Sequence, residues 1–159
     1  MEPLTRKTFD LMTLKEAYNF FESLKTETTK KSEIRVYEKF VYILSELKIR
    51  EFTKSENQSL ETELDSLNLK SNQDIKFFKK ALSKFEKFLK DTFSLTSNAY
   101  YTKLYGGLGL SFGLLFGVVF LSGWERSLGI SLGLIFGMVI GSIIGRSMDV
   151  KAKSEGRIL

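Results

Sequence analysis

Two long apolar runs in the last third of the chain differ from everything that precedes them. Residues 104–121 and 128–145 each comprise 18 residues without a charged side chain. As helices they would be about 27 Å long at 1.5 Å per residue, close to the roughly 30 Å of a bilayer's hydrocarbon core. The pattern predicts two transmembrane helices, joined by the short loop 122–127 into an antiparallel hairpin.

Glycine recurs at every fourth position in both runs. The eight positions are Gly109, Gly113, Gly117, Gly129, Gly133, Gly137, Gly141 and Gly145. Steps of four residues place glycines on one helix face, and small residues let two backbones approach closely within a membrane. We therefore predict transmembrane helix packing through these glycines. The second run carries more glycine than a three-glycine partner covers, so we also expect a helix from another subunit near Gly141 and Gly145.

Residues typical of a membrane interface flank the two runs. They are Tyr100, Tyr101, Tyr105, Trp124, Lys103 and Arg146. The loop between the runs has no net charge, whereas both outer flanks are basic. Because positive flanks favour the cytoplasmic side, we expect the N-terminus and the C-terminus in the cytoplasm, with residues 146–159 as a cytoplasmic tail.

Residues 1–95 show apolar positions every three or four residues among charged ones, which is a helical spacing. Helices are predicted at about 13–25, 33–52, 54–68 and 73–93. Thr13 and Thr53 each precede a glutamate by three residues, as in a capping box, and Ser71 begins a third start signal. The expected fold class is all-α: an N-terminal cytoplasmic soluble domain of helical hairpins or a bundle, followed by the C-terminal transmembrane hairpin.

The segment 96–103 connects the domain to the first span and contains no proline or glycine. One interpretation is a continuous helix from the fourth predicted helix into the membrane. The other is a new helix capped by Thr96 or Ser97.

The fourth predicted helix is basic as well as apolar. Its lysines are Lys76, Lys79, Lys80, Lys84, Lys87 and Lys90. A helix of this kind could face anionic lipid or a protein partner. The alternative, which we favour, is a bundle helix with a solvated lysine face, because its apolar stripe is narrow. Nucleic acid is disfavoured, since residues 1–103 hold 19 basic against 16 acidic residues.

The chain contains no cysteine and no histidine. Disulfides, thiol nucleophiles, Cys/His zinc sites and histidine bases are thereby excluded. The sequence also lacks the P-loop, GxSxG and HExxH patterns that mark nucleotide binding, serine hydrolysis and metalloproteolysis. We expect no enzyme, no catalytic residues, no cofactor, no metal site and no small-molecule substrate.

The hairpin, about 40 of the 159 residues, resembles small bacterial membrane proteins with glycine-zipper two-helix hairpins. The resemblance rests on the glycines described above and implies self-assembly in the bacterial inner (plasma) membrane. The leading hypothesis is a homo-oligomer with a cytoplasmic helical collar or docking domain. One alternative is a monomeric anchor or adaptor that binds another protein. Another is a membrane-permeabilising, pore-type effector gated by the soluble domain.

Overall fold

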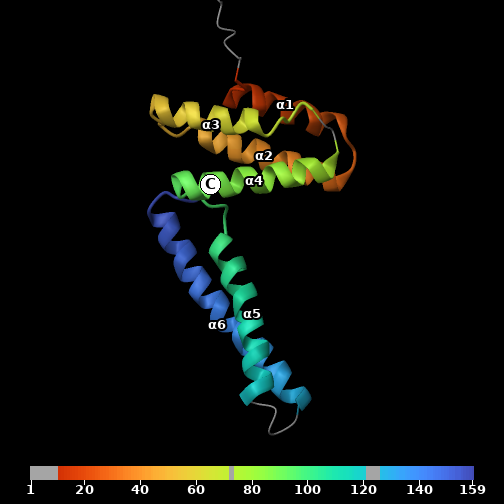
Figure 1. The fold of residues 1–159 in the computed structure, drawn as a ribbon, viewed down its shortest axis with the longest axis vertical. Coiled ribbons are helices and arrows are strands. Elements are labelled where there is room, and N and C mark those ends of the chain that lie inside the picture. Colours follow the sequence, from red (N-terminus) through yellow and green to blue (C-terminus); the bar gives the residue numbers. More distant parts are fainter. Residues whose placement is uncertain (1–10, 72–73, 121–125) are drawn as a thin grey trace, which may run out of the picture. The chain divides into compact units, whose positions relative to one another are not determined.

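The computed structural model describes residues 11–71, 74–120 and 126–159, and its six helices confirm the all-α fold class (Figure 1). Within these ranges the only β-type pairing is an isolated bridge between Thr96 and Ile158. The chain divides into two compact units, Met1–Asp91 and Thr92–Leu159.

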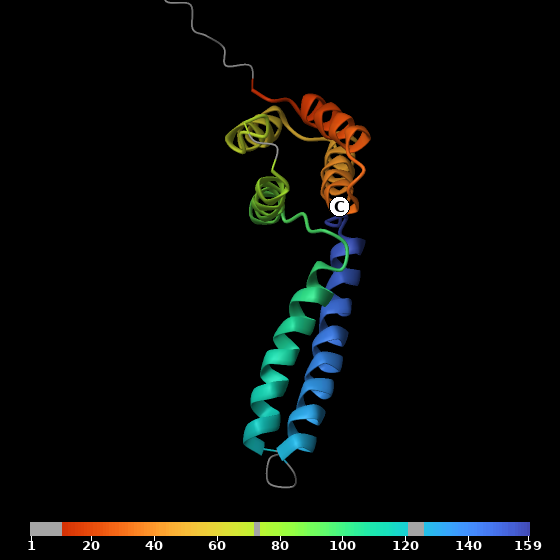
Figure 2. The same cartoon turned by 90° about the vertical axis from the view of Figure 1, so that its right-hand side faces the viewer.

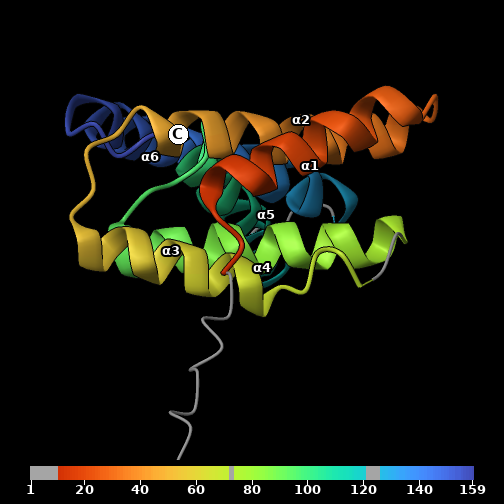
Figure 3. The ribbon, with the colours of Figure 1, turned by 90° about the horizontal axis from the view of Figure 1, so that it is seen from above.

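The first unit contains four helices. They are α1 (Leu14–Glu27), α2 (Lys31–Lys48), α3 (Lys54–Ser66) and α4 (Ile75–Phe93). All four were predicted, although α2 ends four residues before the predicted position 52. Within this unit, α1 and α2 lie on one side with α3 and α4 on the other, as Figures 2 and 3 show from two directions.

Local capping chemistry determines where these helices begin. The capping boxes of Thr13 with Glu16 and of Thr53 with Glu56 are both formed. At the second, the hydroxyl and the backbone N–H of Thr53 both donate to the carboxylate and hold the pKa of Glu56 below its ordinary value. The third start signal was misplaced by three residues. Asp74, rather than Ser71, accepts from a first-turn amide of α4.

Aromatic rings from three helices form the centre of the first unit. Phe21 of α1 stacks on Phe40 of α2, with ring centroids 3.9 Å apart. Phe78 of α4 meets Phe21 edge-on at 5.6 Å and Tyr37 at 5.5 Å. Such pairs add about 0.5–1.5 kcal/mol beyond the area they bury. The three phenylalanines are completely buried, so this unit has its own hydrophobic core.

The second unit consists mainly of α5 (Tyr100–Phe120) and α6 (Arg126–Ser154), which lie side by side in Figures 1 and 2. The continuous-helix interpretation was wrong, because α4 ends at Phe93 and the left-handed residues Ser94 and Ala99 (φ 56° and 58°) separate it from α5. Residues 100–103, predicted as connector, belong to α5. Residues 146–154, predicted as tail, continue α6.

Candidate functional site

Glycine backbones form the contact face between α5 and α6. A Cβ atom added at Gly113 would lie 3.0 Å from the Cα of Gly137 and would overlap the carbonyl oxygen of Gly133. One added at Gly109 would lie 3.1 Å from the Cα of Gly141 and would overlap the Gly137 oxygen. Cβ atoms essentially never come within 3.0 Å of another heavy atom. Only glycine therefore permits this separation of the two helices.

The contact face continues to both ends of the helix pair. A Cβ at Gly117 would lie 2.5 Å from the oxygen of Gly129. A Cβ at Gly145 would lie 2.5 Å from the Cα of Thr102, and one at Gly141 would overlap the oxygen of Tyr105. The glycines near the end of α6 thus pack against α5 of the same chain. The surplus of glycine that suggested a helix from another subunit is used within the hairpin.

The outer surfaces of the hairpin are apolar. Both helices are long and apolar enough to cross a membrane, in the segments Tyr100–Val119 and Leu128–Ser154. Only 17% and 22% of their most apolar windows are buried, so the hairpin does not enclose its large side chains. The most exposed of these include Phe112, Leu115, Ile135, Phe136 and Ile143.

A groove runs along one side of the glycine contact face. It has a volume of about 760 Å³. Gly109, Gly113 and Gly137 are among its lining residues, together with the larger side chains of Phe112 and Phe136. Tyr105, predicted as an interface residue, also lines the groove.

Asp149 of α6 caps the beginning of α5. Its carboxylate accepts from the backbone N–H groups of Tyr101 and Thr102 at 3.0 and 2.9 Å, and from the Thr102 hydroxyl at 2.6 Å. The first amides of a helix have no partner within the helix, and a negative charge at this end also interacts favourably with the helix dipole. Asp149 therefore joins the ends of the two helices.

The connector before α5 pairs with the residues that follow α6. Thr96 donates its backbone N–H to the oxygen of Arg157 and accepts from the N–H of Leu159, both at 2.9 Å. A hydrogen bond to the Glu155 carboxylate raises the pKa of the Arg157 guanidinium above its ordinary value, and a hydrogen bond with Tyr101 contributes less to the same shift. These contacts form a second connection between the two strands of chain at the same end of the hairpin, in addition to the Asp149 cap.

The predicted membrane-interface residues do not share one environment in the structure. Tyr100 and Tyr101 form an edge-on ring pair at 5.2 Å, whereas Lys103 and Arg146 are exposed. Trp124 lies outside the described residues.

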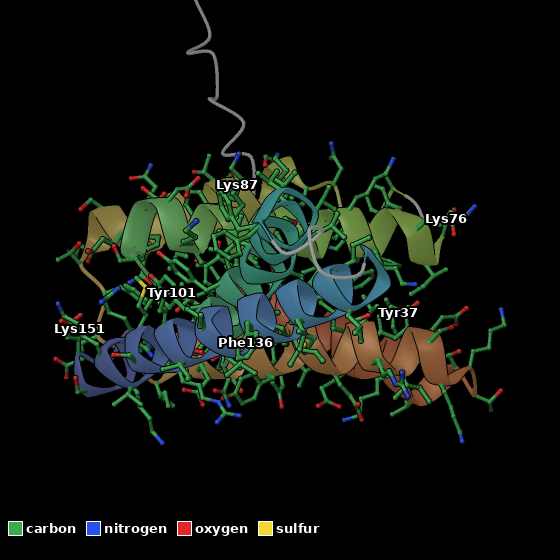
Figure 4. All side chains as sticks on the ribbon, turned by 90° about the horizontal axis from the view of Figure 1, so that it is seen from below. Tyr37, Lys76, Lys87, Tyr101, Phe136 and Lys151 are labelled. Atoms are coloured by element: carbon green, nitrogen blue, oxygen red, sulfur yellow. The ribbon has the colours of Figure 1, made fainter. Side chains whose placement is uncertain are left out.

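The predicted basic residues of α4 are all exposed, and Lys76 and Lys87 are labelled in Figure 4. Lys84 forms an ion pair with Glu63 of α3 at 3.4 Å. The apolar stripe of the same helix, including Phe78, Phe85 and Leu89, is buried. This burial agrees with the bundle interpretation of α4.

Among residues 11–71, 74–120 and 126–159, no group of three or more acidic, His or Cys side chains is arranged to hold a metal ion. Comparisons of the chain with protein-family models, curated proteins and solved structures find no match.

Sequence reasoning did not identify Asp149 as a capping residue. Its only local signal is an acidic side chain one helical turn beyond Gly145, on the glycine-bearing side of α6. In an antiparallel pair, a side chain at this position lies beside the first turn of the partner helix.

Proposed function

We propose that this chain is an integral membrane protein whose α5–α6 hairpin anchors the α1–α4 unit at a membrane surface. The observation that carries the proposal is the combination of a backbone-to-backbone contact face with large apolar side chains on the outside. Contiguous apolar patches of more than a few hundred Å² are rare on soluble monomers. In a bilayer the same surface is surrounded by lipid tails, so the free-energy cost of exposing apolar side chains to water does not arise.

The charge distribution supports one orientation in that membrane. Lys103 precedes the apolar part of the first span, and Arg146, Lys151 and Lys153 follow the apolar part of the second. Since basic flanks favour the cytoplasmic side, we place both termini and the α1–α4 unit there. This unit has a buried aromatic core and a charged exterior, and it would act as a docking domain or adaptor for another macromolecule.

Arginine on the outer surface of the hairpin provides the test of the anchor. Leu115→Arg and Ile135→Arg replace side chains that are 60% and 58% exposed. An arginine at the centre of a span costs about 2.5–3.5 kcal/mol on insertion scales, so the double variant should reduce membrane-inserted protein by about 50-fold or more. The measurement is the fraction of full-length chain that stays with membranes after an alkaline wash.

Ile49→Arg is the matched control, since Ile49 is 77% exposed on the first unit. Its membrane fraction should equal that of the parent chain. If the double variant also remained fully in washed membranes, the anchor proposal would be rejected.

Homo-oligomerisation is the second candidate, and the groove beside the glycine contact face favours it. Its walls include Phe112 and Phe136, and small residues along its floor would allow close approach of a further helix. The particle mass in nanodiscs, measured by native mass spectrometry, should then be a multiple of 18.2 kDa.

Phe112→Ala with Phe136→Ala should lower that mass, because the groove loses two walls while the hairpin contact is unchanged. Leu110→Ala with Met138→Ala, on exposed residues outside the groove lining, should leave it unchanged. A parent particle of one chain would exclude the oligomer and leave the monomeric anchor. The pore-type effector remains a prediction from the sequence alone.

A further inference from the structure

Positive charge in the first unit is concentrated on α4. This helix has six lysines and two acidic residues, whereas α3 has one lysine and four acidic residues. Lys76, Lys79, Lys80 and Lys87, hereafter the lysine face, are all exposed. At 3.6 residues per turn these four lie within an arc of about 100°, which also contains Lys90. Lys90 is not counted in the face, because it already interacts with another group. The buried stripe of Phe78, Phe85 and Leu89 occupies the opposite side of the helix.

The lysine face is not neutralised by neighbouring acids. Within the described residues, the ion pairs of α4 are Glu86 with Lys39 at 2.8 Å and Lys84 with Glu63 at 3.4 Å, and neither uses a residue of this face. Asp91 is the remaining acidic residue of the helix and is exposed. Four positive charges along the helix thus have no partner in this part of the chain.

Burial of the apolar stripe decides how α4 can meet a partner. Phe78, Phe85 and Leu89 lie in the core of the first unit and are not available to enter a lipid or protein surface. A peripheral amphipathic helix inserts its apolar side into the membrane. For α4, such insertion would require the bundle to unfold, so it is excluded in the folded protein. Contact through the opposite side is electrostatic, and its partner must be an anionic surface.

The length of the connection indicates which anionic surface is close. Six residues, 94–99, separate α4 from α5, and six residues extend to at most about 20 Å. Thr96, in the middle of them, is hydrogen-bonded to Arg157 and Leu159 in the second unit. If the hairpin spans a membrane, α4 cannot leave the neighbourhood of that membrane, and the local concentration of headgroups is correspondingly high.

We infer that the lysine face of α4 binds anionic phospholipid headgroups of the membrane in which the hairpin is anchored. The inference rests on the anchor proposed above. Lysines near an anionic leaflet are attracted to it over about one Debye length, which is about 8 Å at physiological ionic strength. An acidic protein or a nucleic acid would match the charge equally well but has no such permanent proximity.

The test uses the full chain in lipid nanodiscs with a single fluorophore. Because the chain has no cysteine, Ser83→Cys gives one labelling site, on the exposed side of α4 beside Lys79 and Lys80. Discs contain a headgroup-attached quencher and either only zwitterionic lipid or 30% phosphatidylglycerol. Quenching should be at least threefold stronger in the anionic discs at 50 mM salt. It should fall to the zwitterionic level at 1 M salt, where the Debye length is about 3 Å.

Two quadruple variants with equal loss of charge identify the surface. Lys76→Gln, Lys79→Gln, Lys80→Gln and Lys87→Gln together should abolish the difference between the lipids. The control replaces four exposed lysines elsewhere in the first unit, namely Lys15, Lys31, Lys54 and Lys70, and should retain that difference. Unchanged far-ultraviolet circular dichroism establishes that each variant is folded.

Incorporation into discs is measured before quenching, which separates the two proposals. A chain that does not enter discs contradicts the anchor. A chain that enters but shows equal quenching in both lipids overturns the lysine-face inference alone, as expected if the face serves an acidic protein or nucleic acid. Equal effects of both quadruple variants also overturn it, because net charge rather than this face would be responsible.

Discussion

Replacing Gly113 and Gly137 by alanine is expected to separate α5 from α6. A Cβ at Gly137 would lie 2.7 Å from the Cα of Gly113, and the neighbouring clashes are with carbonyl groups. Backbone cannot rotate away as a side chain can, so the helices must move apart along the whole contact. Overpacking costs about 1–3 kcal/mol at a single buried site. Gly113 and Gly137 touch each other, so the two substitutions are coupled and their costs are not a simple sum.

A disulfide across the hairpin measures this separation. A Cβ at Gly106 would lie 3.4 Å from the Ser142 hydroxyl oxygen, so Gly106→Cys with Ser142→Cys should oxidise readily. The two added alanines should slow cross-linking at least fivefold. Gly107→Ala is the control, because nothing lies within 4 Å of its added Cβ. Equal cross-linking rates in all three backgrounds would mean that glycine is not required for the contact.

Substituting Asp149 by alanine should release the first turn of α5. The change removes three hydrogen-bond acceptances, to two backbone amides and one hydroxyl. Loss of a helix cap costs about 0.5–2 kcal/mol, and hydrogen bonds to a charged group contribute about 1.5–3 kcal/mol. Hydrogen exchange at the amides of Tyr101 and Thr102 should therefore accelerate about tenfold or more in nanodiscs.

Two further variants separate charge from geometry at this cap. Asp149→Asn keeps an acceptor oxygen without the charge and should give an intermediate exchange rate. Thr102→Val removes only the hydroxyl donor and should affect exchange least. Asp91→Ala, at an exposed acid of α4, should leave the amides of α5 unchanged. If the amides of the Asp149→Ala chain exchanged at the same rate as those of the parent chain, the cap would not contribute to the stability of the first turn of α5.

Features determined by short-range chemistry were accessible from the sequence. The capping boxes at Thr13 and Thr53 need only a residue and its neighbour three positions later, and both are formed. Helical spacing of apolar residues likewise predicted four helices in the first unit, and two uncharged apolar runs predicted the two long helices after it. The glycine period predicted which side of each long helix would face a neighbour, because a step of four is close to one helical turn.

Features that depend on a distant partner were not accessible in this way. The surplus glycine of α6 was attributed to another subunit, because the helical extent of residues 100–103 and 146–154 was not anticipated. With those residues helical, Gly145 meets Thr102 of the same chain. The alternatives for α4 also differed in what covers its apolar stripe. Phe78 packs against rings of α1 and α2, and Phe85 is completely buried.

The position of Asp149 has a consequence for the order of events during synthesis. Asp149 follows Thr102 by 47 residues, so the ribosome completes the beginning of α5 well before the group that caps it exists. At about 5–20 residues per second, the two amides wait roughly 2 to 9 seconds for their carboxylate. If the hairpin is inserted into a membrane as proposed, its first helix begins without this cap, and the two helix ends are joined only after the second helix has been translated.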